Sequence, residues 1–140
     1  MLTFDRCVNT LLQRLGLDNF LMLAGRALIS YIFITAGWAK IGGYAGTAAY
    51  MESKGLPGSL LVLVILLELG GGLAILVGYQ TRIVALFFTV FCIVSGLMFH
   101  GAPEEATSLL KNISIAGGFL FLLAQGAGKF SLDNLLTKKS

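Results

Sequence analysis

The chain has 140 residues, of which 56% are hydrophobic and 12% are charged. Soluble domains carry about 25% charged residues, because water must solvate their surfaces, and a chain this short leaves much of its area exposed. The composition therefore excludes a disordered chain and argues against a soluble globular domain, so we expect the protein to lie in a lipid bilayer. The net charge of +3 is modest, and no basic run is interleaved with aromatic residues, so we expect no nucleic-acid partner.

The N-terminal stretch is amphipathic. Apolar side chains recur there at helical spacing, with charged and polar residues between them. This pattern predicts a helix that lies on the membrane surface. The apolar positions are Phe4, Val8, Leu11, Leu12 and Leu15.

Four apolar runs follow, at residues 20–38, 59–79, 83–99 and 109–125. Each has about 17–21 residues, or roughly 26–32 Å as a helix, which matches the thickness of a hydrocarbon core. No series of alternating segments of about ten residues indicates a β-barrel, so helices are left to satisfy the backbone in lipid. The first run exceeds the usual apolar region of a signal peptide, and we expect it to be retained. The sequence thus predicts one all-α domain over residues 1–140, a four-helix transmembrane bundle.

The segments between the runs carry turn residues and two further short helices. A loop of three residues, 80–82, separates the second and third runs and predicts a tight antiparallel hairpin. Residues 44–54 in the first loop and 131–136 near the C-terminus are each expected to form a short interfacial helix, the latter with Ser131 as its N-cap. Pro103 can occupy the first turn of the fourth helix.

Lysine and arginine residues outside the runs predict the orientation, because they are enriched in cytoplasmic loops. Only Lys40 and Lys54 fall on the side of the first and third loops. We therefore expect both termini in the cytoplasm of a bacterial cell and the protein in its inner membrane. The six on the side of the termini are Arg6, Arg14, Arg82, Lys129, Lys138 and Lys139.

Ionisable residues within the runs are the candidates for function, because each costs at least about 2.5–3.5 kcal/mol to place in hydrocarbon. Glu68 lies in the middle of the second run and is too short to reach the interface, so it must face the interior of the bundle. Its side chain leans toward the outer side, from which Lys111 enters. The sequence favours a polar pocket formed by Glu68, Lys111, Asn112 and His100. Arg26 in the first run is the second candidate for the partner of Glu68.

A structural alternative is a buried ion pair that sets helix register without binding a ligand. The chain has one histidine, which excludes a bis-histidine haem site. Its two cysteines match no metal-binding spacing, so no metal site is expected. The sequence also contains no catalytic or nucleotide-binding motif. No cofactor is therefore intrinsic to the chain, whether it is an enzyme stays open, and a quinone is the simplest cofactor for a redox role.

The ordered motifs of residues 20–136 resemble the DoxX family. They are Arg26, "FITAGWAKIGGYAGTAAYMESKGLPG" at 33–58, "LLELGGGLAILVGYQTR" around Glu68, the Lys111–Asn112 pair and the closing "GAGKFSLDNLL". The resemblance implies a four-helix protein of the inner membrane. The family is named after a small subunit associated with an archaeal quinol oxidase or thiosulfate:quinone oxidoreductase, and most members are called oxidoreductases by that name alone.

Two functions follow as expectations. The first is an accessory or quinone-linked component of redox or stress metabolism, with a polar site around Glu68 and a redox partner protein. The second is a non-enzymatic transporter or a binding scaffold for a small hydrophobic molecule or a partner protein. A transporter of only four helices implies a homo-oligomer.

Overall fold

The computed structural model describes residues 2–139, and within that range every regular element is helical. Four helical segments are long and apolar enough to cross a membrane: Leu17–Gly42, Gly58–Val77, Thr81–Phe99 and Pro103–Gln125. The predicted all-α fold with four spans is confirmed. In chain order the elements are α1 (Leu2–Arg14), α2 (Leu17–Gly42), α3 (Tyr44–Ser53), η1 (Gly58–Leu60), α4 (Leu61–Ile65), η2 (Leu66–Gly71), α5 (Gly72–Val77), α6 (Thr81–Phe99), η3 (Pro103–Glu105), α7 (Ala106–Gln125) and α8 (Leu132–Thr137).

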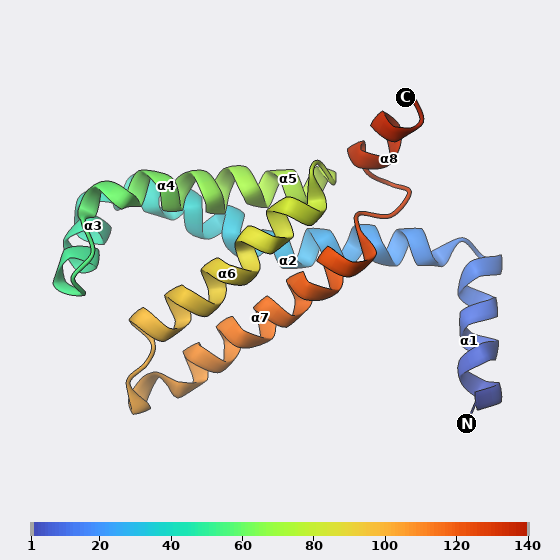
Figure 1. Cartoon of the computed structure of the whole chain (residues 1–140), viewed down its shortest axis with the longest axis horizontal. Coiled ribbons are helices and arrows are strands. Elements are labelled where there is room, and N and C mark those ends of the chain that lie inside the picture. Colours follow the sequence, from blue (N-terminus) through green and yellow to red (C-terminus); the bar gives the residue numbers. More distant parts are fainter. Residues whose placement is uncertain (1, 140) are drawn as a thin grey trace.

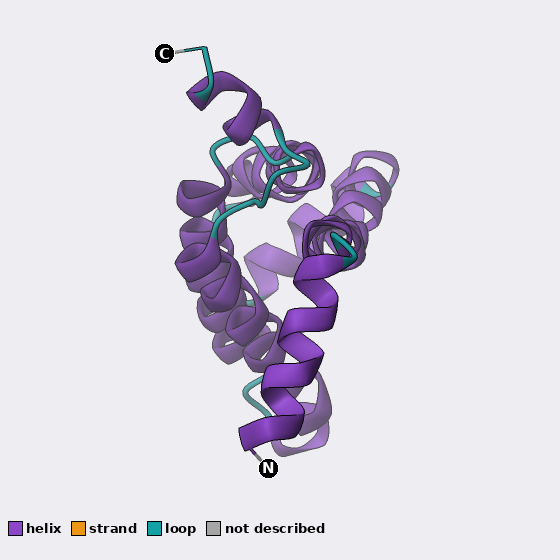
Figure 2. Cartoon of the chain, turned by 90° about the vertical axis from the view of Figure 1, so that its right-hand side faces the viewer, coloured by secondary structure: helices purple, strands orange, loops and turns teal. Residues whose placement is uncertain are grey.

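Helices α1, α3 and α8 lie outside the spans, as the sequence predicts. The amphipathic helix α1 turns away from α2 and runs across its direction (Figures 1 and 2), which suits a helix lying along a membrane surface. Helix α3 occupies the first loop, and Ser131 caps α8 by accepting a hydrogen bond from the backbone N–H of Asn134. Both termini are at the same end of the molecule, opposite α3 and the α6–α7 connection (Figure 1).

The spans form two pairs. The first pair is α2 with the segment α4–η2–α5, and the second is α6 with α7. Figure 1 shows the pairs meeting near the end that carries the termini and diverging toward the other end. The turn between the second and third spans is short, but these spans do not form a hairpin that is tight along its length. The expectation is wrong because α7 packs along α6 and draws it away from α4.

Three aromatic rings join the two pairs at mid-length. The centroid of Phe88 is 4.4 Å from that of Phe33 and 4.8 Å from that of Phe119, so all three spans meet at this point. Gly71 admits the Phe88 ring, since a Cβ there would lie 3.0 Å from the ring. Lipid tails are as apolar as these side chains, so close packing rather than exclusion of water holds the core.

A polar layer ties the helices together at the end with the termini. The Asp133 carboxylate of α8 accepts hydrogen bonds from the backbone N–H groups of Gln80 and Thr81, at 2.7 and 2.9 Å, and so caps α6. Gly78 ends α5 with a φ of +74°, and a Cβ at this position would overlap the Arg26 guanidinium. The two pairs of spans are therefore joined at this end and separate at the other.

Candidate functional site

A cavity of about 900 Å³ occupies the space where the two pairs of spans diverge. Its lining is mostly apolar and comes from α2, α3, α4, η2, α6 and α7. The rings of Tyr50 on α3 and Phe99 on α6 lie 5.6 Å apart and bridge the two pairs at the far end. Other lining residues are exposed, with Val94 at 48% and Leu110 at 61%. Because these residues belong to membrane spans, the cavity opens toward the lipid.

Glu68 is the buried acidic residue of this cavity and is 5% exposed. It belongs to η2, a π-helical segment of six residues, Leu66–Gly71. Segments of π-helix are rare and occur often at functional sites. Three glycines, at 70–72, begin two residues after Glu68 and lower the cost of departing from α-helical geometry.

Gly37 brings α2 against η2 at the level of Glu68. A Cβ on Gly37 would lie 2.8 Å from the backbone nitrogen of Leu69 and 3.2 Å from Cβ of Glu68, so only glycine permits this approach. Lys40 follows three residues later, on the same face of α2. The close approach at Gly37 thus places the Lys40 side chain within reach of Glu68.

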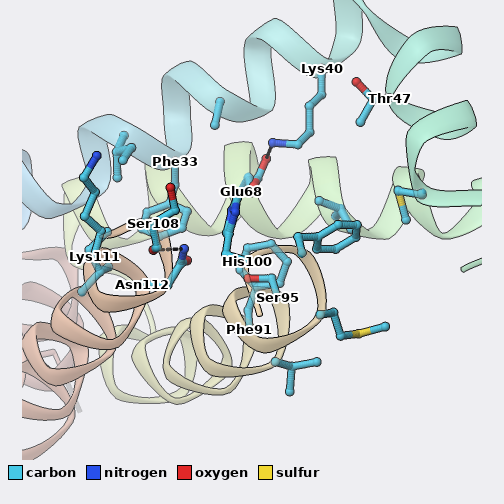
Figure 3. A pocket seen from close by; sticks show the side chains of 18 of the residues that line it. Phe33, Lys40, Thr47, Glu68, Phe91, Ser95, His100, Ser108, Lys111 and Asn112 are labelled. Atoms are coloured by element: carbon cyan, nitrogen blue, oxygen red, sulfur yellow. Dashed lines mark hydrogen bonds and ion pairs between the residues drawn. The ribbon is translucent and has the colours of Figure 1, made fainter. Parts of the chain in front are cut away.

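Lys40 is the partner of Glu68. Its Nζ lies 2.7 Å from Oε2 of Glu68, and the two side chains are 26% and 7% exposed (Figure 3). The sequence favours Lys111 in this role, with Arg26 second, and the structure corrects both assignments. The sequence places Lys40 in a loop because the apolar run ends at residue 38, but α2 continues to Gly42. Cations are favoured in the last turn of a helix, and this signal could have identified Lys40.

Lys111, Asn112 and His100 line the same cavity as Glu68 without contacting its carboxylate. The Asn112 side chain donates to the backbone oxygen of Ser108 at 3.0 Å, and His100 Nδ1 lies 2.8 Å from Oε2 of Glu105. Within residues 2–139, Lys111 forms no ion pair, and its side chain extends from the first turns of α7 (Figure 3). Four of the five candidate residues are thus brought into one cavity.

Arg26, the fifth candidate, lies outside this cavity, near the end with the termini. Its guanidinium donates to the backbone oxygens of Ile75, Leu76 and Phe130. The first two carbonyls belong to the last turn of α5, where a cation is favoured by the helix dipole. Arg26 therefore joins α2 to α5 and to the segment before α8.

The cavity combines a large apolar surface with a few polar groups at one level. An ammonium group carries three N–H donors, and within residues 2–139 Lys40 pairs with Glu68 alone, so two donors remain for a ligand. Nowhere in residues 2–139 do three or more histidine, cysteine, aspartate or glutamate side chains gather as metal ligands do. The arrangement suits a ligand with an apolar body and hydrogen-bonding oxygens.

The fold and the cavity define the class of the protein: an integral membrane protein with four helical spans and a polar site between them. A comparison with protein families matches residues 21–101 to the DoxX family model. The chain belongs to the DoxX family.

The chain is similar to three proteins of named bacteria. It is 51% identical to the inner membrane protein YqjF of Escherichia coli over 126 residues, which are 88% of this chain and 97% of the relative. It is 32% identical to the inner membrane protein YphA of the same organism over 123 residues, 81% of this chain and 88% of the relative. A shorter match, 34% identity over 65 residues, covers 46% of this chain and 48% of the "Putative oxidoreductase CatD" of Bacillus subtilis. No solved structure matches the chain.

The spans and these relatives together support a location in the bacterial inner membrane.

Proposed function

We propose that this protein binds a small hydrophobic molecule of the quinone class between its two pairs of spans, as an accessory component of redox or stress metabolism. The observation that carries the proposal is the cavity of about 900 Å³ with the Lys40–Glu68 pair on its wall. Sites for small molecules have volumes of about 300–1,000 Å³, mostly apolar walls and a few placed polar groups. The name of the relative CatD supports a link to redox metabolism.

The polar groups of the cavity match the chemistry of a quinone headgroup. Lys40 and Asn112 carry N–H donors for carbonyl oxygens, and the Glu68 carboxylate accepts a hydrogen bond from a quinol hydroxyl. The apolar walls, including Phe33 and Phe91, suit the ring and the start of an isoprenoid tail. The opening toward the lipid gives such a molecule a route from the bilayer.

The test uses the full chain purified into lipid nanodiscs, with its co-purifying small molecules identified by mass spectrometry. Glu68→Gln removes the charge of the carboxylate and nearly preserves its shape, and Lys40→Met removes the ammonium. Glu104→Gln is the matched control, because Glu104 is exposed and does not line the cavity. We expect a quinone to be retained by the unmodified protein and the control and to be reduced about tenfold or more in both site variants, since hydrogen bonds to charged groups contribute about 1.5–3 kcal/mol.

Absence of quinone from the unmodified protein, together with failure to bind added quinone analogues, would overturn the proposal. A second function would then be favoured by the lateral opening of the cavity: carriage of another hydrophobic compound, with Glu68 as a gating carboxylate. That function requires a homo-oligomer, because four spans are few for a transporter. Its test is the mass of the protein in native-like lipid, and a monomer would contradict it.

The orientation with both termini in the cytoplasm is part of the same proposal. It is supported by the positive charge on the side of α1 and α8 and places the opening near α3 in the periplasmic half of the bilayer. Cysteine labelling with a membrane-impermeant maleimide tests it. The cysteine introduced by Ser53→Cys should react in intact spheroplasts, whereas the native Cys7 should react only after lysis.

A further inference from the structure

A second, smaller cavity lies on the lipid-facing side between α2 and α7, near the end with the termini. This α2–α7 groove has a volume of about 260 Å³. Its walls include Leu21, Ile29, Phe121 and Gln125, and its lining also contains Gly25 and Arg26. It is separate from the cavity that contains Glu68, since none of its lining residues is shared with it.

The shape of the α2–α7 groove suits an extended chain. Its lining runs along α2 from Leu21 to Ile29, a rise of roughly 12 Å. Leu21 is 51% exposed and Phe121 74% exposed, so the groove is open to lipid on its outer side. Gly25 keeps the space free, because a Cβ there would meet no atom within 4 Å. A drug-sized ligand needs a larger volume, whereas one acyl chain can lie along the groove.

Arg26 is the charged residue in the lining of this groove. The residue is 1% exposed, and its Nε–H has no hydrogen-bond partner within the described chain. The other nitrogens bind backbone carbonyls, and no carboxylate of residues 2–139 forms an ion pair with the guanidinium. Asp133, the carboxylate with an electrostatic effect on Arg26, is held by the backbone of Gln80 and Thr81. A buried cation thus keeps one free donor and lacks a direct counter-ion.

Further basic residues lie where the groove reaches the membrane surface. Arg82 donates to the backbone oxygens of Leu123 and Ala124 at the end of α7. Lys129 is exposed and follows Gly128, which packs against Met22 of the groove lining. Asp18 and Asp133 are acidic residues of the same region, so together with Arg26, Arg82 and Lys129 the charges there sum to +1. Basic pockets between spans on one side of a membrane are a recurrent form of site for anionic lipid headgroups.

We propose that the α2–α7 groove binds an anionic phospholipid of the leaflet next to the termini. One acyl chain lies between Leu21 and Phe121. The headgroup phosphate lies toward Arg82 and Lys129. The phosphate then supplies a negative charge near the buried guanidinium of Arg26, which forms no ion pair within residues 2–139.

The experiment measures lipid retained by the full chain after reconstitution in an equimolar mixture of phosphatidylglycerol and phosphatidylcholine. The protein is released in a mild detergent, and bound lipids are counted by native mass spectrometry. Gly25→Leu places a side chain in the groove, starting from a Cβ that meets no atom within 4 Å. Gly117→Leu is the matched control, because a Cβ at Gly117 also meets nothing within 4 Å and the residue lies outside both cavities.

We expect the unmodified protein and Gly117→Leu to retain phosphatidylglycerol about fivefold or more over phosphatidylcholine, equivalent to about 1 kcal/mol for one charge near the surface. Gly25→Leu should lose most of this preference. Phe121→Ala removes an exposed wall of the groove and should also weaken retention, which keeps the test informative if Gly25→Leu fails to fold.

Equal retention of the two lipids by the unmodified protein would overturn the proposal, and so would an unchanged preference in both Gly25→Leu and Phe121→Ala. The outcome is independent of the quinone experiment, because the two cavities lie in different parts of the molecule.

Discussion

The Lys40–Glu68 ion pair can be tested by a double-mutant cycle on the unfolding free energy. The variants are Lys40→Met, Glu68→Gln and the double substitution. Removing one partner of a fully buried pair costs about 3–5 kcal/mol, because the other charge stays buried alone. Glu68 is 7% exposed, so loss of Lys40 should come near that range, at about 2–4 kcal/mol. Lys40 is 26% exposed and can turn toward the interface, so loss of Glu68 should cost less, about 1–2 kcal/mol.

The double variant should lose less unfolding free energy than the two single variants together. The difference, about 1–2 kcal/mol, is the coupling energy of neighbours that share one interaction. Unfolding by SDS in mixed micelles, followed by circular dichroism, measures all four proteins under the same conditions. A coupling within about 0.5 kcal/mol of zero would refute the pairing, since residues without a shared interaction are additive to that extent. The same cycle with Lys111→Met in place of Lys40→Met is the control and should be additive.

Three further substitutions test the helix contacts, one at the level of Glu68 and two in the polar layer near the termini. Gly37→Ala places a Cβ 2.8 Å from a backbone nitrogen of η2 and should lower the unfolding free energy by about 1–3 kcal/mol. Gly25→Ala is the control and should be neutral or stabilising, because a Cβ there has no atom within 4 Å. Equal effects of the two substitutions in the SDS titration would contradict the close approach of α2 and η2. Gly78→Ala should destabilise the protein more than Gly16→Ala in the same titration. Both glycines have a positive φ, but only a Cβ at Gly78 would also clash, with the Arg26 guanidinium. Similar losses of unfolding free energy would show that backbone strain alone matters. Asp133→Ala removes the cap of α6 and should lower the unfolding free energy by about 1–2 kcal/mol. Amide hydrogen exchange in α8 should become faster in this variant. Unchanged exchange would show that α8 is held by other contacts.

The elements that follow from local pattern were predictable from the sequence. The four spans depend on the length of their apolar runs and on the need to satisfy every backbone group in lipid, and neither condition involves another part of the chain. The amphipathic spacing of α1 and the N-cap at Ser131 are likewise local. That Glu68 faces the interior also followed from its depth, because a short charged side chain cannot reach the interface from there.

The partner of Glu68 and the shape of the cavity were decided by the tertiary structure. The pairing with Lys40 depends on α2 continuing past its apolar run and on the contact of Gly37 with η2, which joins residues about thirty positions apart. The cavity exists because α7 packs along α6 while α4 stays with α2, so consecutive spans diverge. Arg26 and Lys111 both carry a positive charge within apolar runs. Arg26 donates hydrogen bonds to three backbone carbonyls, whereas Lys111 lines the cavity. Charge and depth restrict the candidates, but the packing of distant segments selects among them.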